Sequence, residues 1–158
     1  MPRPSRRWSR SGGFTLLELL VVVALIALAT TGVSFALRDS QASVLEREAA
    51  RLLAMLETGR AQSRTTGATV RWTPDAKGFV FDGVSTRGVS TESLAGPRPW
   101  LDPAIEVQVM EPAGERSLVL GPEPLLPRQS VVLRLGAHQL RLGTDGLAPF
   151  ALQTGGEP

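Results

Sequence analysis

The most constraining feature of this sequence is a long uncharged and mostly apolar run near its N-terminus. Leu19–Leu37 contains no charged side chain, and four arginines precede it within the first ten residues. About 20 apolar residues in an α-helix span the roughly 30 Å hydrocarbon core of a bilayer. The run is therefore long enough to cross a membrane. The positive-inside rule predicts that the basic end stays cytoplasmic and that the residues after Arg38 lie on the far side.

Two other interpretations of this run are open. A core helix would be apolar on one face, whereas apolar residues occupy every face here. An ordinary signal peptide is the stronger competitor, because Ala27-Leu28-Ala29 has the A-x-A form that signal peptidase accepts. Glu18 argues against it, since an acid in a membrane helix costs up to about 3 kcal/mol and usually has a function. A tolerated acid near the membrane interface remains the alternative for Glu18.

The charge of the chain is unevenly distributed. Residues 1–13 carry four of the 17 basic residues and none of the 15 acids. The remainder holds thirteen basic residues against fifteen acids, a formal net charge of −2. A basic leader before an apolar run indicates membrane targeting rather than nucleic-acid binding. The absence of cysteine excludes disulfides, thiolate metal sites and cysteine nucleophiles.

The residues around the start of the apolar run form a specific pattern. The segment 11–18, SGGFTLLE, resembles the processing site of type IV prepilins and type II secretion pseudopilins. This resemblance implies that a prepilin peptidase cleaves after Gly13 and that Phe14 becomes the N-methylated first residue. It also implies that Glu18, the fifth mature residue, meets the N-terminus of a neighbouring subunit during assembly. A carboxylate is a suitable counter-charge for an ammonium group in an apolar setting, although desolvation offsets much of the gain.

A second helical pattern follows the apolar run. If the helix is unbroken over Phe14–Arg64 it has 51 residues and a length of about 77 Å. Glu48 with Arg51, and Glu57 with Arg60, are three residues apart and are expected to pair on its charged face. We expect the apolar face to pack on the domain of the same chain, with a separate partner-binding helix as the alternative. The apolar face consists of Leu45, Ala49, Leu52, Leu53 and Leu56.

The rest of the chain has a β pattern, with short apolar segments divided by glycine, proline and aspartate. We expect hairpin turns at residues 74–78 and 144–146. The range 86–103, rich in glycine, serine and proline, is predicted to be a long loop. The expected strands are Ala68–Trp72, Gly78–Phe81, Ile105–Met110, Ser117–Leu120, Ser130–Leu135, His138–Leu142 and Pro149–Leu152.

The sequence offers little for catalysis. His138 is the only histidine, so a histidine metal cluster is impossible, and we expect a surface or half-buried residue. The aspartates lack calcium-loop spacing, and no glycine-rich phosphate loop follows a strand. We therefore predict no enzyme activity, no metal and no cofactor. Arg128, Arg134 and Arg141 could form a small basic stripe, but strand arginines that face water are the commoner case.

These observations predict an α+β fold: a long N-terminal helix, half transmembrane and half amphipathic, packed on a C-terminal antiparallel β domain, as in pilins. The C-terminal segments, such as residues 78–81 and 143–146, are similar to the minor pseudopilin H group. The resemblance implies a structural subunit of the type II secretion pseudopilus, with the β domain in the periplasm. Its partners would be other pseudopilins, prepilin peptidase, the inner membrane and secreted cargo. The expected segments are 1–13 (leader), 14–37 (transmembrane and assembly helix), 38–66 (amphipathic helix) and 67–158 (β domain).

Two alternatives to this function remain. The first is a FimT-type minor pilin of type IV pili, some of which bind DNA during uptake through a basic C-terminal tail. Here residues 151–158 contain no arginine and one acid, which argues against a nucleic-acid partner. The second is a secreted or anchored enzyme behind an ordinary signal sequence.

Overall fold

The computed structural model describes residues 16–84 and 94–153, with side chains for residues 16–27, 40–84 and 94–153. The chain divides into two compact units, Met1–Leu37 and Arg38–Pro158. In the first unit, the described residues form the beginning of α1, which runs from Leu16 to Thr66. The large apolar side chains from Leu16 to Ile26 are 42–78% exposed. This unit therefore has no core of its own over these residues.

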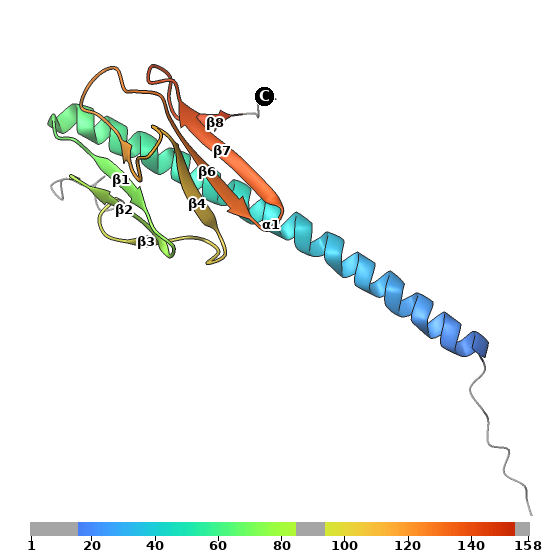
Figure 1. The fold of residues 1–158 in the computed structure, drawn as a ribbon. Coiled ribbons are helices and arrows are strands. Elements are labelled where there is room, and N and C mark those ends of the chain that lie inside the picture. The colour runs from blue at the N-terminus through green and yellow to red at the C-terminus, as the bar shows by residue number, and fades with distance from the viewer. Residues whose placement is uncertain (1–15, 85–93, 154–158) are drawn as a thin grey trace, which may run out of the picture. The chain divides into compact units, whose positions relative to one another are not determined.

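The second unit contains the amphipathic part of α1. Four of the five residues expected on the apolar face are at most 1% exposed, and Leu53 is partly buried against them. The predicted apolar face is thus confirmed, and it packs on the β strands of the same chain (Figure 1). Burying a large aliphatic side chain contributes about 1.5–3 kcal/mol of stabilising free energy. This contact is therefore a main source of stability for the helix.

Eight strands form two four-stranded antiparallel sheets in the described residues, which confirms the α+β class. Sheet A has the order β3-β2-β1-β5, and sheet B has the order β4-β6-β7-β8. Figure 1 shows the strands alongside the later part of α1. The strands are β1 Arg71–Pro74, β2 Gly78–Asp82, β3 Arg98–Pro99, β4 Glu106–Glu111, β5 Leu118–Val119, β6 Gln129–Leu135, β7 His138–Thr144 and β8 Ala151–Gln153.

The turn between β1 and β2 confirms the first predicted hairpin. The backbone N–H of Asp75 donates to the carbonyl of Gly78 at 2.8 Å. The Asp75 Oδ1 accepts from the backbone N–H groups of Lys77 at 2.6 Å and Gly78 at 2.8 Å. An aspartate that bonds its own turn in this way fixes the hairpin locally, which is why the sequence pattern was sufficient to find it.

The predicted loop over residues 86–103 is wrong for its last part. Arg98–Pro99 forms β3 beside Gly78 and Phe79, and Trp100 is only 5% exposed. Glycine is required at position 78, because a Cβ there would collide with the carbonyl of Arg98. A proline-containing strand is tolerated here since β3 is an edge strand. Residues 86–93 of the predicted loop lie outside the described residues.

Sheet B is built on a long hairpin. Strands β6 and β7 are paired over seven residue pairs, from Gln129↔Thr144 to Leu135↔His138. The alternate residues Val131, Leu133 and Leu135 face the core and are at most 2% exposed. Ser130 and Val132 between them are buried as well, and only Arg134 is exposed, so most of this strand is covered on both faces. The expected strands at positions 130–135 and 138–142 are therefore confirmed, with ends one or two residues longer.

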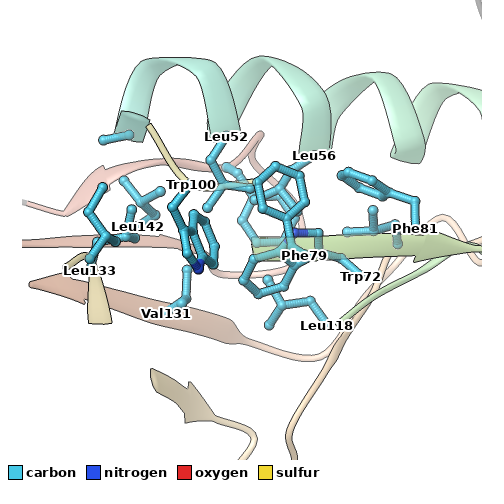
Figure 2. Close-up of a cluster of buried hydrophobic side chains, with 14 of the residues drawn as sticks. Leu52, Leu56, Trp72, Phe79, Phe81, Trp100, Leu118, Val131, Leu133 and Leu142 are labelled. Atoms are coloured by element: carbon cyan, nitrogen blue, oxygen red, sulfur yellow. The ribbon is translucent and has the colours of Figure 1, made fainter. Parts of the chain in front are cut away.

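The core lies between α1 and the two sheets. Figure 2 shows Leu52 and Leu56 of α1 pointing toward the aromatic and aliphatic side chains of the strands. On the side of sheet A, the Phe79 ring centroid lies 4.9 Å from that of Trp100 and 6.0 Å from that of Trp72. Such aromatic contacts contribute about 0.5–1.5 kcal/mol each beyond the area that they bury.

A buried glutamine connects the two sheets. Gln129, at the start of β6, is 1% exposed. Its Oε1 accepts from the backbone N–H of Val119 in β5, and its Nε2 donates to the carbonyl of Val119, both at 2.8 Å. The side-chain amide thus supplies both bonds that a neighbouring strand would supply. It satisfies backbone groups of sheet A from a residue of sheet B.

Candidate processing and assembly site

The structure describes one of the three residues predicted to act in processing and assembly. Glu18 lies in the first turn of α1 and is exposed. An acidic side chain in this position is favoured by the positive end of the helix dipole. Gly13 and Phe14 lie outside the described residues, so the predicted cleavage point and the distance from Glu18 to a mature N-terminus stay predictions.

A buried acid of α1 holds the segment that contains β3. Glu48 is completely buried and pairs with Arg51, whose Nη1 lies 3.1 Å from its Oε2. The same Oε2 accepts from the backbone N–H of Leu101 at 3.0 Å. Arg51 also donates to the carbonyl of Pro99 at 3.2 Å and lies 5.4 Å from the ring centroid of Phe79. The predicted pair of Glu48 and Arg51 is confirmed, but it fixes sheet A to the helix instead of lying on a solvated face.

The second predicted pair, Glu57 with Arg60, is wrong. Arg60 is 2% exposed, and its two Nη atoms donate to the carbonyls of Ala148 at 2.8 Å and Gly146 at 2.9 Å. Glu57 Oε1 accepts from the backbone N–H of Phe150 at 2.8 Å. Both side chains therefore reach the segment between β7 and β8, because its backbone groups need partners once they are packed against the helix.

The turn between β7 and β8 is further fixed by its own side chains, at the second predicted turn. The Asp145 Oδ1 accepts from the backbone N–H groups of Ala148 at 2.8 Å and Leu147 at 2.9 Å. These two bonds, that from Ala148 first, hold the pKa of Asp145 below its ordinary value, with a smaller contribution from the charge of Arg128. Thr144 Oγ1 donates to the carbonyl of Ala148 at 2.6 Å. The predicted hairpin signal at residues 144–146 thus marks a strongly bonded turn.

The remaining residues singled out in the sequence lie in or next to the strands of sheet B. His138 is half-buried at the start of β7, as expected. Arg141 donates to Glu111 Oε2 at 3.2 Å and to Ser130 Oγ at 2.9 Å, whereas Arg128 and Arg134 are exposed. In the described part of the chain, no three histidine, aspartate or glutamate side chains are grouped so that they could hold a metal ion.

The comparisons with known proteins concern the N-terminal segment. The family described as Prokaryotic N-terminal methylation motif matches residues 8–34. The matched range includes Gly13, Phe14 and Glu18. It supports a type IV pilin-like, prepilin-type protein, and it implies processing by a prepilin peptidase and assembly with other pilin-like subunits. No curated protein and no solved structure matches the chain.

The match concerns a motif that is typical of membrane-anchored pilins. Within the residues that the structure describes, no helix has both the length and the apolar character needed to cross a membrane.

Proposed function

We propose that this chain is a minor pseudopilin of the H type, a non-enzymatic structural subunit of the pseudopilus that drives type II secretion. The observation that carries the proposal is the methylation motif at residues 8–34. It precedes a unit in which one amphipathic helix packs on two antiparallel sheets. We propose that this unit acts by binding other subunits or secreted cargo through its surface.

The membrane part of the proposal rests on the sequence. Leu19–Leu37 would cross the inner membrane once, with the arginines of the leader in the cytoplasm and residues 38–158 in the periplasm. Cleavage after Gly13 would leave methylated Phe14 as the mature N-terminus. Mass analysis of the protein isolated from its host tests this directly. A mature chain that begins at Thr30 instead would identify signal peptidase as the processing enzyme and would overturn the proposal.

The proposed role of Glu18 is to set the register of the subunit in the filament. We expect Glu18→Ala to be processed and inserted normally but to be lost from crosslinked complexes with other pilin-like subunits, because the ammonium of a neighbouring subunit then lacks its counter-charge. Glu46→Ala is a matched control, since Glu46 is an exposed acid of α1 in the second unit. Normal recovery of Glu18→Ala in these complexes would remove this role.

A minor pilin of type IV pili, acting in pilus biogenesis or DNA uptake, is the second candidate. The exposed side chains of Arg128 and Arg134 favour it. The bond of Arg141 to Glu111 and the net charge of −2 beyond residue 13 weigh against it, since phosphate binding depends on a basic surface.

Deletion of the gene separates the two candidates. The pseudopilin proposal predicts that secreted proteins accumulate in the periplasm while piliation and transformation are unchanged. Loss of pili or of transformation with normal secretion would favour the pilus candidate. The purified full chain can also be tested for DNA binding. Binding that weakens steeply with salt would support the pilus candidate, whereas no binding at low salt would exclude a DNA role.

A further inference from the structure

The two sheets have four edge strands, and three of these edges are short or already bonded. Strand β3 has two residues, one of which is Pro99, and the carbonyl of that proline accepts from Arg51 at 3.2 Å. Strand β5 also has two residues, and Gln129 bonds both backbone groups of Val119. Strand β8 has only three residues. Natural sheets protect their edges in such ways, because free N–H and C=O groups can pair with another extended chain.

Strand β4, Glu106–Glu111, is the fourth edge and the longest (Figure 1). It pairs with β6 on one side, and no strand within the described residues pairs with its other side. The pairing with β6 is regular over residues 106–109 and shifts in register between Val109 and Glu111. Every second residue of a regular antiparallel strand directs its N–H and C=O away from its partner. Residues 106–109 can therefore pair with a further strand.

Two cavities lie along these residues. The first, of about 620 Å³, is lined by the start of β4 and by the turn at residues 74–76. The second, of about 410 Å³, is lined by the middle of β4 and by residues 114–116. Pro74 and Val107 line both cavities, so the two adjoin along the strand. Their volumes are in the range of roughly 300–1,000 Å³ that is usual for ligand sites. They favour one extended chain over a second folded copy, because a folded sheet brings further strands to the same space.

The side chains along this edge indicate the chemistry of the chain that would pair with it. The first cavity is lined by the exposed acids Asp75 and Glu106 and by no basic residue. Arg134 is opposite Glu106 in β6, but it lines neither of the two cavities. The residues that the cavities share, Pro74 and Val107, are apolar. A segment with a basic residue beside the acids and an apolar residue beside Val107 is complementary to this surface.

We propose that the free edge of β4 binds an extended polypeptide segment that carries a basic residue, which adds a fifth strand to sheet B. Main-chain hydrogen bonds along residues 106–109 supply the affinity, and Asp75 and Glu106 select the basic residue. This inference goes beyond the proposed function, because it involves neither the methylation motif nor the membrane segment.

A synthetic peptide tests the proposal on the full chain in detergent. The probe is the acetylated and amidated peptide Lys-Thr-Val-Thr-Val-Thr-Lys, in which one lysine can reach the acids in either strand direction. The first comparison peptide carries N-methyl groups on two consecutive central residues, which removes a donor from each of its edges. The second has glutamate in place of both lysines. Calorimetry measures binding, and hydrogen exchange locates it on the chain.

We expect the lysine peptide to bind and to slow exchange along residues 106–109, and we expect the N-methylated peptide not to bind. Glu106→Lys should weaken binding of the lysine peptide about fivefold, since an exposed charge pair is lost. Glu123→Lys is the matched control and should leave binding unchanged, because Glu123 is an exposed acid between β5 and β6 that lines neither cavity.

The inference would be overturned if the lysine peptide does not bind, if either comparison peptide binds equally well, or if protection appears at another edge strand. Slow exchange at every residue of 106–109 without peptide would also overturn it, because a second copy or another segment of the chain would then already cover this edge. Each of these results leaves the proposed function standing.

Discussion

Sheet A and sheet B pack against the same helix, but they are stabilised in different ways. Sheet A has strands of two to five residues, and its β1 and β5 are joined by only two residue pairs. Sheet B is built on the seven pairs between β6 and β7. Two short paired strands share few backbone hydrogen bonds, so side chains must hold them in place. Two long paired strands are held by many such bonds.

The polar contacts with α1 differ in the same sense. Sheet A is held by Glu48 and Arg51, which bond the backbone around β3, and by the ring of Phe79 beneath Arg51. Sheet B is held by Glu57 and Arg60, which bond only the turn before β8. Single substitutions should therefore disturb the packing of sheet A as a whole, whereas in sheet B they should act locally.

The largest effect is expected for Phe79→Ala. Phe79 is 1% exposed and contacts the rings of Trp72, Phe81 and Trp100, so its loss should cost about 3–5 kcal/mol of unfolding free energy. Denaturant unfolding of the full chain in detergent measures the cost, and tryptophan fluorescence should report altered packing at Trp72 and Trp100.

The matched variant in sheet B is Leu133→Ala, which removes a completely buried side chain from the long hairpin. We expect it to cost about 2–5 kcal/mol while the tryptophan emission of the folded protein is unchanged. The proposed difference between the sheets would be contradicted if both variants altered the tryptophan emission equally.

Arg60→Met should have the next largest effect. It leaves the carbonyls of Gly146 and Ala148 without their donors, at a cost of about 1–3 kcal/mol. Hydrogen exchange should accelerate at residues 145–150 and stay unchanged in β1 and β2. Arg47→Met is the control, since Arg47 is exposed and bonds only within the helix. Faster exchange throughout sheet A would contradict the expectation that the bonds of Arg60 stabilise only the turn before β8.

Gln129→Leu tests the connection between the sheets. The backbone N–H and carbonyl of Val119 would lose their buried partner, which should cost about 1–3 kcal/mol. We expect the loss of exchange protection at residues 118–120 to exceed that in β6. Gln139→Leu serves for comparison, because Gln139 is exposed in the neighbouring strand. If the exchange protection of β5 is unchanged, its pairing with β1 alone is sufficient to hold this strand in the sheet.

The smallest effect is expected from titration of Asp145. Its pKa lies below the ordinary value of 3.8 in the folded protein, so the bonds that it accepts are stabilising above that pH. The stabilisation should be lost as the pH falls through the lowered pKa. The amide NMR signals of Leu147 and Ala148 should therefore be constant from pH 7 to pH 5 and shift only in stronger acid. In Asp145→Ala this acid transition should disappear; its persistence would assign it to another group.

Several elements were predictable because their signals are local. The apolar face of α1 and the hairpins at residues 74–78 and 144–146 each depend on spacings of a few residues. Strand β3 was missed because two residues next to a proline have no period of their own. Its existence depends on Gly78, which lets the chain approach from 20 residues away.

The buried charges were placed on the wrong face for a related reason. Glu48 follows Leu45 by three residues and Arg60 follows Leu56 by four, so both were in register with the apolar face. That spacing was the available signal. The prediction followed the general rule that charged side chains face water. These two side chains are buried because backbone groups from distant parts of the chain bond them.

The methylation motif, the uncharged run, the amphipathic face of the helix and the turns of an α+β protein can all be found in the sequence without a structure. These depend on which residues are near one another in the chain. The inward positions of Glu48 and Arg60, and the bonds by which Gln129 joins the two sheets, become visible only in the folded chain. A buried polar side chain bonds the backbone groups that packing leaves without a partner, and those groups lie up to 93 residues away in the chain.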